Sequence, residues 1–118
     1  MQLLTQDLRD QLLANGRQQQ PLRGTPDEKD FVPVVKLFTP DAGATWLLTE
    51  IDPEDPDIAF GLCDLGLGFP ELGSVSLTEL AAVRGRLGLP VERDLHFAAT
   101  KPLSAYAADA LRHGAIRS

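Results

Sequence analysis

The sequence has few of the residues that usually carry recognisable chemistry. Its 118 residues include one cysteine, one tryptophan, one tyrosine and two histidines. The single cysteine, Cys63, excludes an intrachain disulfide and any cluster of thiolates that could hold zinc or an iron–sulfur centre. Serine-nucleophile and phosphate-loop spacings are also absent. We therefore expect a reducing compartment and no resident cofactor.

Long hydrophobic runs are missing as well. No segment approaches the roughly 20 consecutive apolar residues of a membrane span. The N-terminal stretch MQLLTQDLRDQLL is acidic by position 7 and lacks the apolar centre of a secretory signal. These absences predict a cytoplasmic protein. With 43% apolar and 24% charged residues, the chain has the composition of a folded protein, and its length fits a single domain over residues 1–118.

Basic residues are absent from the middle of the chain. Nine acidic residues and no lysine or arginine lie between Lys36 and Arg84, in a protein of net charge −6. Affinity for a nucleic-acid backbone comes from neutralising phosphates with lysine and arginine. We therefore expect no direct nucleic-acid binding by this acidic block, which suits a basic protein partner instead.

The two ends of the chain have helical patterns. Leu4, Leu8 and Leu12 recur at a spacing of four, and Thr5 is placed to cap the first turn. We expect this helix to stop at Asn15–Gly16, where glycine can adopt a left-handed conformation. A second amphipathic pattern covers residues 102–114.

The central part of the chain is typical of β-structure. Short β-prone runs cover residues 31–38, 45–51, 58–65 and 72–77, and Pro, Asp and Gly separate them. A capping box predicts a short helix over 76–83, and alternation predicts a further strand over 91–97. Connections this short favour antiparallel pairing. We therefore predict an α+β fold, with a four- or five-stranded, mainly antiparallel sheet and the N-terminal and C-terminal helices packed on one face.

Three stretches, KLFTPD, ELGSVSLTEL and LGLPVERDL, resemble the bacterial domain of unknown function 2958. The resemblance extends from about Leu3 to Ser104. It implies association with plasmids, integrative elements and phages, and it transfers no activity and no catalytic residue. It favours an accessory protein of a mobile element that binds a host protein, for example in counter-defence.

The densest chemical feature is the acidic stretch TEIDPEDPDIAFGL. It could be a solvated turn, a weak cation site or a docking surface for a basic partner. Calcium loops of known type need a glycine at the sharp turn, whereas Pro53 and Pro56 hold neighbouring carboxylates apart, so we predict no metal. The predicted partner-binding residues are Glu50, Asp52, Glu54, Asp55, Asp57, Asp64 and Glu71.

The segment over 91–97 supports an alternative function. On a strand, Glu92, Asp94 and His96 would lie on one side, with alternate residues about 7 Å apart. Two carboxylates and an imidazole could hold a metal or act as acid and base in a hydrolase or nuclease-like enzyme. The competing interpretation is an exposed polar strand face.

Three arginines near this segment also have two interpretations. Arg84, Arg86 and Arg93 lie around RGRLGLPVERD, and Arg93 shares its predicted strand face with apolar residues. We expect structural ion pairs with the acidic middle of the chain. The alternative is an anion site formed by the backbone of RGRLG.

Overall fold

The computed structural model describes residues 2–118. Its elements, in chain order, are α1 (Gln6–Gln19), the 3₁₀ turn η1 (Gln20–Leu22), β1 (Val35–Phe38), β2 (Thr45–Ile51), β3 (Ile58–Asp64), β4 (Glu71–Ser76), α2 (Leu77–Ala82), β5 (Glu92–Arg93) and α3 (Leu103–His113). None of the helices within residues 2–118 is long and apolar enough to cross a bilayer.

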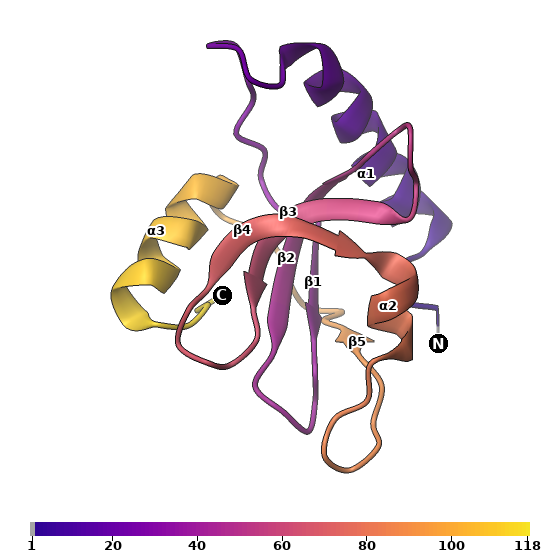
Figure 1. Cartoon of the computed structure of the whole chain (residues 1–118), viewed down its shortest axis with the longest axis vertical. Helices are drawn as coiled ribbons and strands as arrows, with labels where there is room; N and C mark the ends of the chain where they lie inside the picture. The colour runs from indigo at the N-terminus through magenta and orange to yellow at the C-terminus, as the bar shows by residue number, and fades with distance from the viewer. Residues whose placement is uncertain (1) are drawn as a thin grey trace.

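The strands form one antiparallel sheet in the order β4-β3-β2-β1-β5 (Figure 1). The first four strands are neighbours in the order of the sequence, as their short connections predict. β5 adds two residues beyond β1, where Glu92 lies opposite Phe38 and Arg93 opposite Leu37. The predicted α+β class and antiparallel sheet are confirmed.

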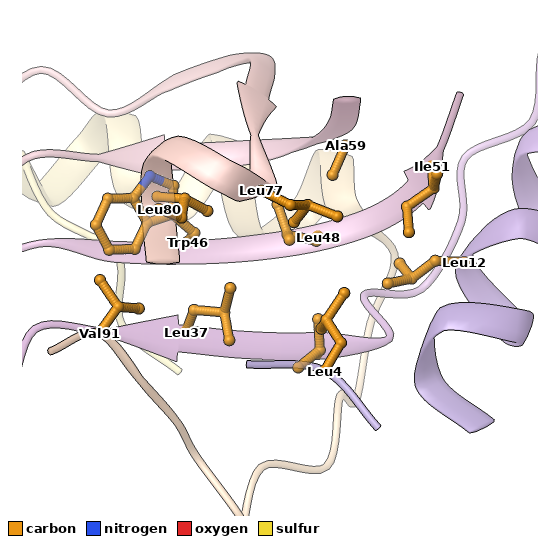
Figure 2. Close-up of a cluster of buried hydrophobic side chains, with 11 residues drawn as sticks. Leu4, Leu12, Leu37, Trp46, Leu48, Ile51, Ala59, Leu77, Leu80 and Val91 are labelled. Atoms are coloured by element: carbon orange, nitrogen blue, oxygen red, sulfur yellow. The ribbon is translucent and has the colours of Figure 1, made fainter. Parts of the chain in front are cut away.

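The terminal helices cover opposite faces of this sheet, contrary to the prediction that they share one face (Figure 1). Leu12 of α1 and Leu77 and Leu80 of α2 pack with Trp46 and Leu48 on one face (Figure 2). On the other face, α3 packs against residues of β2 and β3, in a cluster formed by Leu47, Leu62, Leu103, Tyr106 and Ala110. Because neighbouring strand residues point to opposite sides, both faces of β2 carry apolar side chains and both require cover.

Helix α1 continues past the predicted stop at Asn15–Gly16 and ends at Gln19. Gly16 has a packing role: a Cβ on this residue would lie 1.8 Å from the carbonyl oxygen of Ile51. Asn15, which is also buried, donates a hydrogen bond of 2.9 Å from Nδ2 to the carbonyl oxygen of Thr49. The Asn-Gly pair therefore joins α1 to the end of β2.

A β-bulge interrupts the pairing of β2 with β3. Leu48 lies opposite Gly61, but the next paired residue of β2 is Glu50, opposite Phe60, which leaves Thr49 as the extra residue. An extra residue reverses the faces of all residues that follow it. Glu50 therefore lies on the α3 face, whereas Ile51 joins the core beneath α1.

Candidate functional site

Five of the seven predicted partner-binding carboxylates accept hydrogen bonds within the protein, and three of these bind groups outside the acidic turn. One of them is Asp57, which fixes the start of α2. Its Oδ1 accepts hydrogen bonds from N and Oγ1 of Thr78, and its Oδ2 accepts one from Oγ of Ser76. The bond from Ser76 and those from Thr78 lower the pKa of Asp57. This carboxylate has a structural role.

Asp64 and Glu71 lie at the other end of β3 from the acidic turn. The register places Ile58 opposite Ser76 and Cys63 opposite Glu71, so the strand separates these residues from the turn. Asp64 is buried, and its two oxygens accept hydrogen bonds from the backbone N–H groups of Gly66 and Ile116. Glu71 is exposed. The structure therefore does not bring the seven carboxylates together on one surface.

The turn between β2 and β3 keeps three carboxylates near solvent. Glu54 and Asp55 are exposed and Asp52 is partly exposed. Asp52 accepts a hydrogen bond from the backbone N–H of Glu54, and Asp55 accepts one from that of Asp57. These local bonds order the turn and leave its charge at the surface.

Glu50 forms the floor of a groove on the α3 face. Two cavities of about 350 and 180 Å³ share Arg23, Glu50 and Phe60 among their lining residues. Asp52 and Ser74 contribute to the smaller cavity, and Leu72 and Ser104 are among the residues around the larger one. We call these two cavities together the Glu50 groove. The sequence offered one signal for it, because Glu50 is the one charged residue in the run TWLLTEI.

The wall of the groove is the segment between η1 and β1, which hydrogen bonds hold to α1, β2 and α3. Gln19 exchanges two hydrogen bonds with the backbone of Lys29, of 2.7 and 2.8 Å. Asp30 accepts hydrogen bonds from the backbone N–H and the hydroxyl of Ser104, at the start of α3. The segment therefore connects α1 to α3 and holds Arg23 over the sheet.

The groove is lined by four carboxylates, those of Glu28, Asp30, Glu50 and Asp52, and by two cations, Arg23 and Lys29. At its centre a buried carboxylate is paired with a partly exposed cation. Nη2 of Arg23 lies 3.0 Å from Oε2 of Glu50, and their side chains are 48% and 4% exposed, respectively. Burial raises the pKa of Glu50, and the Arg23 guanidinium partly opposes this shift. A buried carboxylate in a cleft is a typical feature of binding and catalytic sites.

The alternative site at Glu92, Asp94 and His96 does not have the predicted geometry. The strand expected over 91–97 is limited to Glu92–Arg93, and the chain then turns, with the backbone N–H of His96 donating to Oδ1 of Asp94. Oδ2 of Asp94 lies 3.7 Å from Nζ of Lys36. Among residues 2–118, no group of three His, Cys, Asp or Glu side chains is placed to hold a metal ion.

Two of the arginines bind backbone carbonyls, which corrects the expectation of ion pairs. Arg93 donates to the carbonyls of Gln2 and Leu3. Arg84 donates to those of Ala81 and Val83, at the end of α2.

The backbone of RGRLG and of the next residue, Leu89, does hold an anion, but that anion is a side chain of the same protein. Oδ2 of Asp41 accepts hydrogen bonds from the N–H groups of Leu87 and Leu89. The carboxylate of Asp41 also fills the space beside Gly85, where a Cβ would lie 1.6 Å from Oδ1.

A second concave region lies between the N-terminal segment and α2. Its volume is about 580 Å³, and Arg9, Asp57 and Leu77 are among its lining residues. Asp57, the one carboxylate among the described residues that line this region, already binds the start of α2. Cys63 is partly buried, and burial raises the pKa of its thiol, which makes it a poor nucleophile.

Comparison with known proteins gives a family match. A model of the family described as "Protein of unknown function (DUF2958)" matches residues 3–117. This match confirms the resemblance seen in the sequence. No curated protein and no solved structure matches the chain.

Proposed function

The chain belongs to the DUF2958 family of proteins of unknown function, and on this premise we propose that it is a binding protein that docks a basic segment of another protein over the Glu50 groove. The observation that carries this proposal is the position of Glu50. Its carboxylate lies at the floor of two cavities, and its cationic partner is half exposed to solvent.

The acidic turn supplies the rim of the proposed site. Asp52 lines the smaller cavity, and the exposed Glu54 and Asp55 continue the negative charge beyond it. Exposed charges of one sign increase the rate of encounter with an oppositely charged partner. A buried charge at the centre discriminates between partners, since it must be paired to be tolerated. The groove and the turn therefore suit one basic segment.

The proposed partner is a basic host protein, of the kind that binds nucleic acid. An acidic protein that covers such a surface would compete with nucleic acid for it. This role would fit counter-defence by a mobile element, in the cytoplasm of the host. The enzyme alternative at Glu92, Asp94 and His96 has no comparable observation in its favour, because the three side chains do not share a strand face.

The proposal is tested with two variants that each remove two negative charges. Asp52→Asn/Glu54→Gln changes the rim of the groove, whereas Asp10→Asn/Glu71→Gln changes exposed residues on α1 and at the far end of β4. Asn at position 52 keeps the oxygen that accepts the hydrogen bond in the turn. The wild type is used to capture proteins from nuclease-treated lysate of the producing cell, and each captured protein is purified and titrated against all three forms.

We expect the rim variant to bind a basic partner about tenfold more weakly than the wild type, with a smaller dependence on salt. The control variant should retain most of the affinity. Equal weakening in the two variants would mean that net charge, and not the groove, determines binding. This result, or the absence of a basic partner, would contradict the proposal.

A further inference from the structure

We infer that the Glu50 groove is a recognition site for an arginine side chain of the partner, and that Arg23 occupies this site in the free protein. The inference rests on the proposed function and specifies its chemistry. It follows from the ion pair between Arg23 and Glu50, from the residues beside that pair, and from the space that remains around it.

The ion pair shows that a guanidinium can reach the buried carboxylate. Nη2 of Arg23 donates to Oε2 of Glu50 at 3.0 Å. This contact uses one nitrogen and one carboxylate oxygen, whereas the planar guanidinium can bind a carboxylate through two parallel hydrogen bonds. An incoming arginine with better alignment would therefore bind more strongly than Arg23 does.

The residues around Glu50 favour arginine over other ligands. Phe60 lines both cavities beside the carboxylate, and a guanidinium stacks on an aromatic ring more readily than an ammonium group. Ser74, in the smaller cavity, offers a hydroxyl acceptor. An anionic ligand would meet the carboxylates of Glu28, Asp30, Glu50 and Asp52, which outnumber the cations Arg23 and Lys29 around the groove. An apolar ligand in place of Arg23 would bury the carboxylate of Glu50 without a partner.

The side chain of Arg23 is positioned so that an arginine of the partner can displace it from Glu50. Arg23 extends from the segment between η1 and β1, and its side chain is 48% exposed although the carboxylate that it binds is almost fully buried. The backbone of this segment stays attached through Lys29 and Asp30. Arg23 can therefore turn outward into solvent without unfolding the wall of the groove. A partner's arginine would replace Arg23, so that Glu50 is paired with a guanidinium both in the free protein and in the complex.

The experiment removes the resident guanidinium and supplies one from solution. Thermal unfolding of Arg23→Ala is measured with millimolar methylguanidinium chloride, and with methylammonium chloride at the same concentration. Arg23→Ala/Glu50→Gln is the control, because it lacks the carboxylate. We expect methylguanidinium to raise the melting temperature of Arg23→Ala, methylammonium to have a smaller effect, and the double variant to respond to neither. Equal shifts with the two salts, or an equal response of the double variant, would overturn the inference.

A second measurement covers the case in which Arg23→Ala does not fold. N-acetylarginine amide is titrated into the wild type and into Arg23→Lys, and binding is followed by NMR at the Phe60 ring. We expect Arg23→Lys to bind the probe about tenfold more tightly than the wild type, since lysine competes less well for the site. No binding by either form would overturn the inference.

The results separate this inference from the proposed function. If methylguanidinium leaves the melting temperature of Arg23→Ala unchanged while Asp52→Asn/Glu54→Gln loses a captured partner, the proposed docking function is retained and the inference of arginine recognition is wrong. If arginine binds in the groove while that rim variant and its control hold the partner equally well, the site is real and the proposed docking function is wrong.

Discussion

Gly16 of α1 lies directly against the backbone of Ile51 at the end of β2. A Cβ at position 16 would lie 1.8 Å from the carbonyl oxygen and 3.0 Å from the carbonyl carbon of Ile51. The helix can approach the strand this closely because glycine has no side chain. The contact also fixes the strand next to the bulge, which determines the face on which Glu50 lies.

Replacing Gly16 with alanine should therefore destabilise the protein, although alanine is the better helix former. The overpacking should cost roughly 1–3 kcal/mol or more, which outweighs the helix propensity gain of about 1 kcal/mol. Urea unfolding measures the difference. Gln18→Ala, at an exposed position of the same helix, should change stability by about 0.5 kcal/mol or less. A more stable Gly16→Ala variant would contradict the close contact.

The stability of the wild type relative to Glu50→Gln should decrease with increasing pH. Burial raises the pKa of Glu50 above its ordinary value of 4.5, so the folded protein holds this proton more tightly than the unfolded chain does. The contribution of the carboxyl group to the free energy of unfolding is therefore greatest below pH 4.5. It is lost as the pH rises through the pKa of the folded state. Urea unfolding of the two proteins from about pH 4 to about pH 8 measures this difference. Parallel pH profiles would contradict the assigned burial.

Asp57→Ala should lower the melting temperature more than Asp55→Ala does. Asp57 accepts three hydrogen bonds from Ser76 and Thr78 at the start of α2, whereas Asp55 accepts one long bond within its own turn. Loss of Asp57 leaves donors at the helix terminus without a partner. Thermal unfolding followed by circular dichroism tests this, and equal shifts for the two variants would show that Asp57 is only a surface charge.

The acid sensitivity of the protein should depend in part on Asp109 of α3. Its oxygens accept hydrogen bonds from Nη2 and Nε of Arg117, at 2.9 and 3.2 Å. The hydrogen bonds and charge of Arg117, together with the nearby His113 and Lys101, lower the pKa of Asp109 from 3.8 to about 2. The stabilisation of the folded protein by the ionised Asp109 is therefore present above pH 3.8 and is lost as the pH falls toward about 2.

Asp109→Asn should consequently lose less stability than the wild type over this acidic range, while Asp10→Asn should follow the wild type. Urea unfolding at a series of acidic pH values makes the comparison. If the wild type and Asp109→Asn lose stability in parallel, the ion pair does not contribute to the acid transition.

Local signals in the sequence predicted most helix ends but not all of them, since α1 continues past the stop predicted at Asn15–Gly16. Thr5 accepts a hydrogen bond from the N–H of Leu8, Ser76 accepts one from that of Glu79, and Gly114 ends α3 with φ of 73°. Caps of this kind depend on residues within one helical turn. The strand predicted over 91–97 forms only at Glu92–Arg93. Alternation of residue types does not show that Asp94 accepts a hydrogen bond from the backbone of His96 and starts a turn.

The candidate site was predicted only in part. The acidic turn was located correctly between β2 and β3, and Asp52, Glu54 and Asp55 remain near solvent there. The sequence did not indicate that Asp57 and Asp64 are engaged with distant backbone and side-chain donors, or that Arg23 pairs with Glu50 across 27 positions. Such long-range partners depend on how the elements pack.

The sequence alone determined the α+β class, the antiparallel pairing and the cation-free central block, because hydrophobic periodicity, turn residues and charge are properties of neighbouring positions. The tertiary structure decided which faces the helices cover and where Glu50 points. One extra residue in β2, held by the contacts of α1 with Thr49 and Ile51, moves Glu50 onto the α3 face beside Phe60. A shift of one residue reverses the faces of a strand, and it leaves no trace in composition or periodicity.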